Sequence, residues 1–473
     1  MPLKTRIATI VLAAAIGASG VTWYAAAHHP QAGLPVHNLL LAFNPNSLAH
    51  DVAFDGSTTG SQGDAQDLAM LDFSLEKLQE VYYKPVDVGA LIRGEEHGLT
   101  LYLKAKHITA QLPAPGQPAD ENAADSMLRY AFAQYGTKTS DDELTYAAIA
   151  GMLDSLGDPY TVFLDPRDKQ SLTELITGGN FGGIGIYIGQ DEKTKETVII
   201  EPIVGTPADR AGLKAGDVIE SVDGHSTKGM PLDPVMNLIR GKANTTVHLV
   251  IRRGAQTEKT FAVVREEIHV PSVAYRMLDH NIGYVQLFDF GDTSAAELTS
   301  ALDALTNQGA KAFVLDLRNN GGGLLRAAVD VSSKFIQDGP IVSIIDREGK
   351  IETHDANGDA IEPHPLVVLV NQYTASASEI TAGAIQDTKV GTLIGVKTFG
   401  KGVVQTIYDL PGESAIKITT ARYVTPAGRD INKKGIEPNV VVQMDPRLVG
   451  IPGKDVQLRT ALESVEKQIA LQH

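Results

Sequence analysis

The sequence predicts a multidomain protein that combines α+β and α/β architecture, and three observations lead to this prediction. The chain has 473 residues, and at roughly 150 residues per domain this length suggests about three folding units. Apolar residues recur every three or four positions in the N-terminal third, which is typical of helices. From about Leu172 short apolar runs bounded by glycine replace this pattern. After Ile268 such runs alternate with helical segments, which favours an α/β layer.

The composition excludes several classes of protein and of chemistry. Hydrophobic residues make up 43% of the chain and charged residues 21%, so the chain can bury a core and is not disordered throughout. The formal net charge of −16 argues against nucleic acid as a partner, because phosphates attract the opposite sign. Cysteine is absent, which removes disulfides, thiolate metal sites and cysteine nucleophiles.

Residues 1–27 have the features of an export segment. Lys4 and Arg6 precede an uncharged run over 7–27, which as a helix would measure about 31 Å and just cross a bilayer. Ala25–Ala27 offers a site for signal peptidase, whereas a tryptophan and a tyrosine in the same run would suit an uncleaved anchor. We therefore expect a signal peptide or membrane anchor. The rest of the chain would be exported to the periplasm or the outer face of the cytoplasmic membrane of a bacterium.

A linker and a helical region follow the export segment. Residues 28–64 form the predicted linker, which ends in a run rich in glycine and serine. Residues 65–170 are predicted to be a helical platform, with helical periodicity beginning near Leu68 and resuming over 122–156. A proline-rich stretch interrupts this region and belongs to an apparent insertion near 104–120.

The next two regions differ in how their strands are spaced. Residues 171–266 carry short β runs with one helix near 232–240, which predicts a compact mixed domain. Residues 267–445 carry the predicted α/β layer. Its expected strands are Ile282–Phe288, Ala312–Leu317, Leu366–Val370, Leu393–Val396 and Ala415–Ala421, and its expected helices cover 295–306, 324–335 and 378–387. Residues 446–473 form a tail whose amphipathic helix is expected to pack on the body or on a second copy.

A serine-rich segment follows the strand predicted over Leu366–Val370. It reads Asn371-Gln-Tyr-Thr-Ala-Ser-Ala-Ser-Glu-Ile380 and leads into a predicted helix. Ser376 would lie at a strand-to-helix turn, where backbone N–H groups and the helix dipole stabilise a developing oxyanion. Ser376 and Glu379 also match a capping box, which is the structural alternative for this segment taken alone.

A lysine between two glycines follows the next predicted strand. The segment is Thr398-Phe-Gly-Lys-Gly-Val-Val-Gln405, and it places Lys401 at a strand end. Such a lysine is usually a solvated surface residue. Burial beside a serine would instead lower its pKa from about 10.4 toward neutrality and allow it to act as a general base. Gln405 could hold the amine, and no histidine occurs between His364 and His473 to serve as a local base.

A glycine-rich segment, Asp316-Leu-Arg-Asn-Asn-Gly-Gly-Gly323, follows an earlier predicted strand. It is neither a P-loop nor a complete G-x-G-x-x-G, so a nucleotide phosphate site is not expected. The glycines would either let backbone N–H groups approach a ligand as oxyanion donors or form a tight turn before the next helix. Both interpretations stand for this segment taken alone.

In this order the three segments resemble the C-terminal processing peptidases, also called tail-specific proteases. The resemblance extends from about Leu68 to Val442 and implies an α/β, crotonase-like Ser–Lys peptidase core over 267–445.

The resemblance also implies roles for individual residues. Ser376 matches the family's nucleophile, Lys401 its general base and Gln405 the residue that orients the lysine. Gly322 and Ala377 match the positions whose backbone N–H groups form the oxyanion hole.

The middle domain, 171–266, resembles a bacterial PDZ domain. The resemblance rests on Thr206-Pro-Ala-Asp-Arg-Ala-Gly-Leu-Lys-Ala-Gly-Asp-Val-Ile219, followed by Val222-Asp-Gly224. A PDZ fold binds a C-terminal carboxylate with backbone N–H groups while the peptide adds a strand to the sheet edge. The positions that match this binding loop are Gly183, Ile184, Gly185 and Ile186. A PDZ domain that is only a spacer or lid is the alternative.

These features predict an exported serine endopeptidase that needs no metal or organic cofactor. Its expected partners are protein or peptide substrates with apolar C-termini. A homodimer and an envelope adaptor protein are compatible with the sequence, and nucleic acid is not expected. The alternatives are a catalytically silent PDZ adaptor or scaffold and, among enzymes, a Ser-His-Asp protease, which the histidine positions disfavour.

Overall fold

The computed structural model describes residues 7–11, 62–114, 116, 118–176, 181–191, 194–254 and 256–471. Most of the predicted export segment and of the linker lies outside these residues. Ile7–Val11 is described as strand β1, which pairs antiparallel with β4 (Ile186–Asp191). Among the helices of the described residues, none is both long and apolar enough to cross a membrane. The signal peptide or anchor therefore stays a prediction.

The helical region forms a bundle with its own hydrophobic core. Its helices are α2 (Gln62–Val81), α3 (Val88–Ala105), α4 (Glu121–Tyr135) and α5 (Asp141–Asp154). Helical pattern over 122–156 is interrupted between α4 and α5, because Ser140 caps α5 by accepting a hydrogen bond from the Glu143 N–H at 3.1 Å. Leucines at three- and four-residue spacing on α2, such as Leu71 and Leu75, are fully buried in this core.

A short connecting region leads from the bundle to the second domain. It contains β2 (Val162–Leu164), α6 (Pro166–Ile176) and β3 (Phe181–Gly183). Strand β3 pairs antiparallel with β10 (Glu266–Ile268), which follows the second domain in the chain. The two ends of the second domain are thus joined to each other by this ladder.

The second domain is a small antiparallel sheet with short helices. Its sheet has the order β1-β4-β5-β6-β8-β9, with β7 paired to β6. The further elements are β5 (Thr197–Pro202), α7 (Pro207–Arg210), β6 (Val218–Val222), β7 (His225–Ser226), α8 (Leu232–Ile239), β8 (Thr246–Arg253) and β9 (Gln256–Val264). Buried aliphatic residues of the strands and of α8, Val235 among them, form its core.

The third domain contains a largely parallel sheet of order β11-β12-β13-β16-β17-β20. Strand β11 lies antiparallel at one edge, and the other neighbours pair in parallel. The elements in chain order are β11 (Val273–Leu278), η1 (Asp279–Asn281), β12 (Ile282–Leu287), α9 (Ser294–Asn307), β13 (Ala312–Asp316), α10 (Leu325–Ser332), β16 (Leu366–Val370), α11 (Ala377–Thr388), β17 (Thr392–Gly395) and β20 (Val440–Val441). The predicted α/β layer, and with it the predicted fold class, is confirmed.

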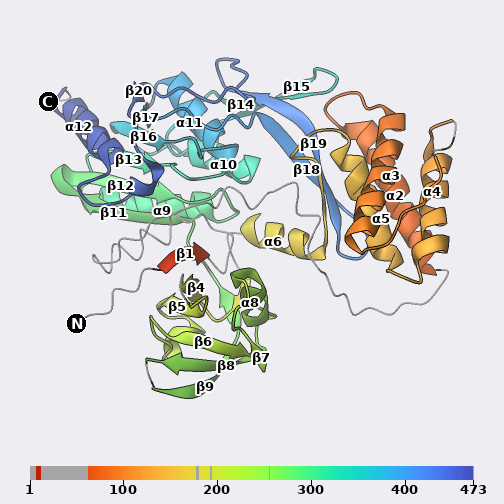
Figure 1. Ribbon diagram of the computed structural model, residues 1–473. Coiled ribbons are helices and arrows are strands. Elements are labelled where there is room, and N and C mark those ends of the chain that lie inside the picture. Colours follow the sequence, from red (N-terminus) through yellow and green to blue (C-terminus); the bar gives the residue numbers. More distant parts are fainter. Residues whose placement is uncertain are drawn as a thin grey trace.

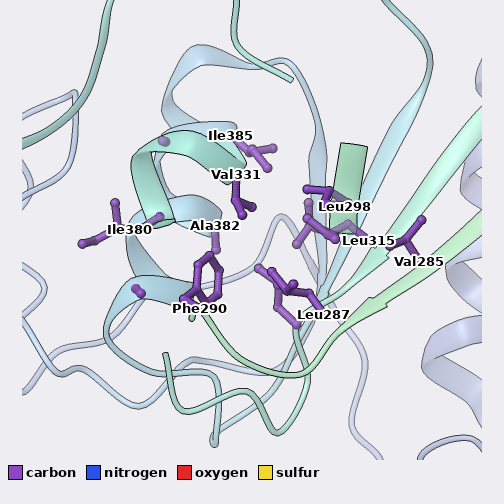
Figure 2. Close-up of a cluster of buried hydrophobic side chains, with 14 of the residues drawn as sticks. Val285, Leu287, Phe290, Leu298, Leu315, Val331, Ile380, Ala382 and Ile385 are labelled. Atoms are coloured by element: carbon purple, nitrogen blue, oxygen red, sulfur yellow. The ribbon is translucent and has the colours of Figure 1, made fainter. Parts of the chain in front are cut away.

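Both faces of this sheet are covered, which explains why its central strands are continuous apolar runs. On one face α9, α10 and α11 enclose the main core, where Val331 and Ile385 lie toward Leu298 of α9 and Leu315 of β13 (Figure 2). On the other face, residues of α12 (Val456–Leu471) pack on the sheet after the short helix η2 (Pro446–Leu448). The predicted tail helix therefore packs on the body of its own chain.

An antiparallel ribbon connects the third domain to the helical bundle. It has the order β15-β14-β19-β18, with β2 paired to β19. Its strands are β14 (Pro340–Asp346), β15 (Ile351–Asp355), β18 (Val403–Asp409) and β19 (Ala415–Val424). Ile416 and Ile418 of β19 are buried in the core of the bundle. Figure 1 shows β18 and β19 reaching from the α/β layer to the bundle, with the second domain set apart from both.

The register of the parallel strands brings the three sequence motifs to one edge of the sheet. Asp316 lies opposite Leu369, and Val370 lies opposite Gly395, so β13, β16 and β17 end at nearly the same level. The loops that follow the carboxyl ends of adjacent parallel strands lie side by side, and this is where open α/β sheets bind their ligands.

Candidate active site

Ser376 lies immediately before α11 in an unusual backbone conformation. Its φ is +56° and its ψ is −120°, whereas a residue that only caps a helix adopts the β region. A non-glycine residue with positive φ is strained, and such strain is concentrated at functional sites. The side chain is half-buried. This conformation favours an exposed nucleophile over a purely capping serine.

Glu379 ties the Ser376 turn to the Lys401 turn. It is fully buried on α11. One carboxylate oxygen accepts the N–H groups of Ser376 at 3.0 Å and of Lys401 at 2.8 Å. The other oxygen accepts the Thr398 hydroxyl at 2.5 Å and the Gly400 N–H at 2.7 Å. The predicted capping relation of Ser376 and Glu379 is present, but the same carboxylate also fixes a second loop.

Lys401 lies between β17 and β18 and is half-buried as a residue. Its Nζ lies 4.8 Å from the centre of the Tyr160 ring, which belongs to the connection between α5 and β2. Burial, together with the charge of Lys417, lowers the pKa of Lys401 to about 8, while the carboxylates of Asp158 and Glu379 act in the opposite direction. A lowered pKa gives the amine a substantial neutral fraction near pH 8, which a general base requires.

The backbones of the candidate nucleophile and base are also joined by Tyr423. Its hydroxyl lies 2.6 Å from the carbonyl oxygen of Lys401 and 3.1 Å from that of Ser376. Among the hydrogen bonds of the described residues, none joins Ser376 Oγ to Lys401 Nζ. The Gln405 amide donates to Thr419 Oγ1 at 3.5 Å instead of contacting the lysine. The structure thus brings the two turns together without linking the reactive atoms.

The two predicted oxyanion donors differ in whether their N–H groups already donate a hydrogen bond. Ala377 occupies the first position of α11, and among the backbone hydrogen bonds of the described residues none uses its N–H. The Gly322 N–H donates to Asn320 Oδ1 at 2.8 Å. Gly322 has a φ of +99°, and a Cβ there would lie 2.8 Å from the Ala377 nitrogen and 2.7 Å from the Ala375 oxygen. Only glycine therefore fits this close approach to the Ser376 turn.

Arg318 anchors the start of the same glycine loop. Its guanidinium is buried and pairs with Asp316 at 2.6 Å and Asp455 at 2.8 Å. The Tyr284 hydroxyl donates to Asp316 at 2.7 Å. Asp455 immediately precedes α12, so the C-terminal tail helps to hold the loop that carries Gly322.

Sequence reasoning did not identify Tyr160, Lys417 or the second role of Glu379. Tyr160 lies more than two hundred residues from Ser376 in the chain, and its neighbourhood shows no periodic or motif signal. Glu379 did carry a signal, since it was recognised as a capping partner. Clusters of three or more His, Cys, Asp or Glu side chains able to hold a metal ion are absent from the residues that the structure describes.

The predicted peptide-binding loop lies between β3 and β4. Gly183 ends β3, Ile186 begins β4, and Ile184 is buried in the domain core. The carbonyl of Gly185 accepts hydrogen bonds from the Ile203 N–H and the Thr206 hydroxyl, at 2.9 and 3.0 Å. Among the backbone hydrogen bonds of the described residues, none uses the N–H groups of Ile184 or Gly185. These two donors are suitably placed for a carboxylate.

Comparisons with known proteins agree with the sequence motifs. Residues 281–442 match Peptidase family S41, and residues 198–253 match the PDZ domain family. The carboxyl-terminal-processing protease of Synechocystis sp. is 39% identical over 340 residues, which cover 70% of this chain and 79% of the relative. The carboxy-terminal processing protease CtpA of Bacillus subtilis is 42% identical over 311 residues, or 66% of each chain. The solved structure of a photosystem II D1 C-terminal processing protease is 33% identical, with a TM-score of 0.45, and the match covers 81% of this chain and 96% of that one.

Proposed function

Because the chain belongs to the carboxyl-terminal-processing proteases of peptidase family S41 and carries a PDZ domain, we propose that it is a serine endopeptidase with a Ser376–Lys401 dyad. Membership of the family confirms the resemblance inferred from the motifs and makes the chain a serine protease. The observation that carries the dyad is the position of Lys401 on a turn that shares the Glu379 carboxylate with Ser376, where desolvation of the amine lowers its pKa to about 8.

In the proposed reaction the neutral amine of Lys401 takes the proton of Ser376 Oγ, and the alkoxide attacks the scissile carbonyl. The N–H of Ala377 stabilises the oxyanion, and that of Gly322 joins it after leaving Asn320 Oδ1. The Lys401 ammonium then protonates the leaving amine, and water hydrolyses the acyl-enzyme. This sequence requires Oγ and Nζ to come within hydrogen-bond distance once substrate is bound, with Gln405 holding the amine.

We assign substrate recognition to the PDZ domain. The N–H groups of Ile184 and Gly185, which no backbone hydrogen bond of the described residues uses, would bind the terminal carboxylate. The last residues of an apolar tail would pair with the edge of β4 in place of β1, which lies on that edge in this structure. The basic residues and uncharged run of 1–27 support export to a bacterial envelope, with release or anchoring left open. A homodimer and an envelope adaptor stay predictions of the sequence.

A catalytically silent PDZ adaptor is the second candidate function. It is favoured by one observation, the lack of a hydrogen bond between Ser376 Oγ and Lys401 Nζ among the described residues. The Ser-His-Asp alternative has less support, because His364 contacts the carbonyl of Glu362 at 2.5 Å and packs on Phe313.

The test measures cleavage of a peptide with an apolar tail, offered as the free acid and as the amide, by the full chain. We expect the free acid to be cleaved faster than the amide. Ser376→Ala and Lys401→Ala should each lower kcat/KM by about 10³-fold or more. Ser343→Ala and Lys397→Ala are matched controls, because Ser343 bonds Thr353 on the ribbon and Lys397 is an exposed partner of Glu437.

The outcomes separate the candidate functions. Full activity of Lys401→Ala would contradict the lysine base, and equal cleavage of acid and amide would contradict capture by the PDZ domain. Tight binding of the free acid without cleavage by the unsubstituted chain would favour the adaptor.

A further inference from the structure

We propose that Lys417, a second half-buried lysine beside the site, is a positioning residue that acts through its charge and holds Lys401 in the neutral form. This inference rests on the proposed role of Lys401 as the general base. Lys417 lies on β19, outside all three sequence motifs.

The pleat of β19 directs Lys417 to the side of the ribbon that carries Gln405. Side chains alternate along a strand, so Ile416 and Ile418 enter the core of the helical bundle while Lys417 and Thr419 point the other way. Thr419 lies opposite Gln405 on β18 and accepts a hydrogen bond from its amide. Lys417 is therefore on the same face as the residue predicted to orient Lys401.

The pairing of β2 with β19 also places Lys417 close to Tyr160, the residue whose ring contacts the Lys401 amine. Val162 of β2 pairs with Lys417, and Thr161 Oγ1 accepts the Thr419 N–H at 3.0 Å. Tyr160, two residues before Val162, lies under the Lys401 amine at 4.8 Å. The two lysines thus share one wall of the site, formed by β19, β2 and the connection that precedes β2.

The charges around the two amines determine which of them loses its proton first. Burial and the Lys417 charge disfavour the charged form of Lys401, while Asp158 and Glu379 favour it. Burial also lowers the pKa of Lys417, against the carboxylates of Asp168 and Asp158. When two close amines compete, the protons leave in separate steps. The carboxylates of Asp168 and Asp158 favour the charged form of Lys417, so in this proposal Lys417 keeps its proton while Lys401 is neutral.

A neighbouring ammonium is a known way to activate a lysine, since it disfavours a second positive charge at short range. The catalytic consequence is specific. Removing the charge of Lys417 leaves Lys401 in place but protonated up to a higher pH, so activity is lost at neutral pH and returns in alkali.

The experiment compares pH profiles of kcat/KM between pH 6 and 10 for the full chain and its Lys417→Met, Lys417→Gln and Lys417→Arg variants. We expect the acid limb to move up by about one pH unit in the Met and Gln variants, with about tenfold less activity at pH 7 and an unchanged alkaline plateau. Lys417→Arg, which keeps the charge, should retain the parent profile. Lys397→Met is the control for loss of an exposed charge.

A second readout does not depend on turnover. The rate at which an amine-specific reagent modifies Lys401, followed by mass spectrometry as a function of pH, reports its protonation directly. An equal loss of activity at every pH, with unmoved amine reactivity, would overturn the proposal and leave Lys417 a structural residue. The proposed dyad can fail separately from this inference. If the Lys401→Ala variant kept its activity, but the pH dependence of Lys401 modification still shifted in the Lys417 variants, the dyad would be refuted and the effect of the Lys417 charge on Lys401 would be supported.

Discussion

Glu95 and Glu379 are both fully buried, but they differ in the hydrogen bonds that their carboxyl groups accept. Both oxygens of Glu379 accept hydrogen bonds. Neither oxygen of Glu95, on α3, has a hydrogen-bond partner among the described residues. Burial, reinforced by the carboxylate of Asp125, raises the pKa of Glu95 well above its ordinary value. A buried carboxyl group without partners destabilises the fold, because the unfolded chain ionises more readily.

We therefore predict that Glu95→Gln stabilises the helical region, and more so at high pH. A carboxyl group with a raised folded-state pKa holds its proton when the unfolded chain has lost it, so its stability contribution falls as pH rises through this interval. Glutamine removes this dependence. The difference in unfolding free energy between variant and parent should grow by about 1.4 kcal/mol per pH unit above the unfolded-state pKa.

Urea unfolding at pH 5, 7 and 8 measures this difference. Glu96→Gln, at the neighbouring and less buried position, is the matched control. A stability difference between the Glu95 variant and the parent that is the same at all three pH values would contradict the assignment.

Among the elements of the fold, two loops are held by the same buried carboxylate. Glu379 on α11 fixes the turn before its own helix and the loop between β17 and β18. This arrangement explains how two segments from successive βα units are held at a fixed spacing, although their reactive side chains make no direct hydrogen bond in this structure.

We predict that Glu379→Gln impairs catalysis more than it impairs folding. Glutamine has a single acceptor oxygen, so its amide group would face backbone donors and leave them unpaired. Unfolding free energy should fall by about 1–3 kcal/mol, while displacement of the Ser376 or Lys401 turn should lower kcat by about 10²-fold. Urea unfolding and peptide cleavage measure the two effects. Glu437→Gln, an exposed carboxylate paired with Lys397, serves as control, and an unchanged kcat would refute the role given to Glu379.

Some elements could be predicted from the sequence and others could not. Strand β16 has the predicted bounds, because it is a short apolar run between clear turn signals. Strands β15 and β18 escaped prediction. β15 is polar and largely exposed, and β18 has no clean alternation, since it leaves the α/β layer to reach the bundle. The break between α4 and α5 was hidden because apolar residues continue on both sides of it.

The candidate site was predictable to the extent that it lies in contiguous motifs. Ser376 and Lys401 stand in glycine-rich or serine-rich turns that follow apolar strands, and the register of those strands brings them to one edge. Lys417 and Tyr160 could not be found in this way. They reach Lys401 only through the pairing of β2 with β19, which no local pattern encodes.

For the molecule as a whole, the helical bundle is tied to the candidate active site by packing and by one side-chain contact. Ile416 and Ile418 join β19 to the bundle core, while the connection after α5 supplies Tyr160 to Lys401. The second domain is joined differently, through the ladder of β3 and β10, and Figure 1 shows it apart from the bundle. A substrate tail bound on β4 would therefore be held by one domain while the bond is cut in another.

The central claim, that Lys401 activates Ser376, is tested most directly by covalent labelling of the full chain. A fluorophosphonate reacts with an activated serine, and mass spectrometry identifies the labelled residue. The account predicts a single adduct on Ser376 that forms about tenfold more slowly at pH 7 than on an alkaline plateau, because the pKa of Lys401 is about 8. Lys401→Ala should label at least about 10³-fold more slowly. Labelling of Ser376 at the same rate in Lys401→Ala, or an adduct on another residue that accounts for the activity, would contradict it.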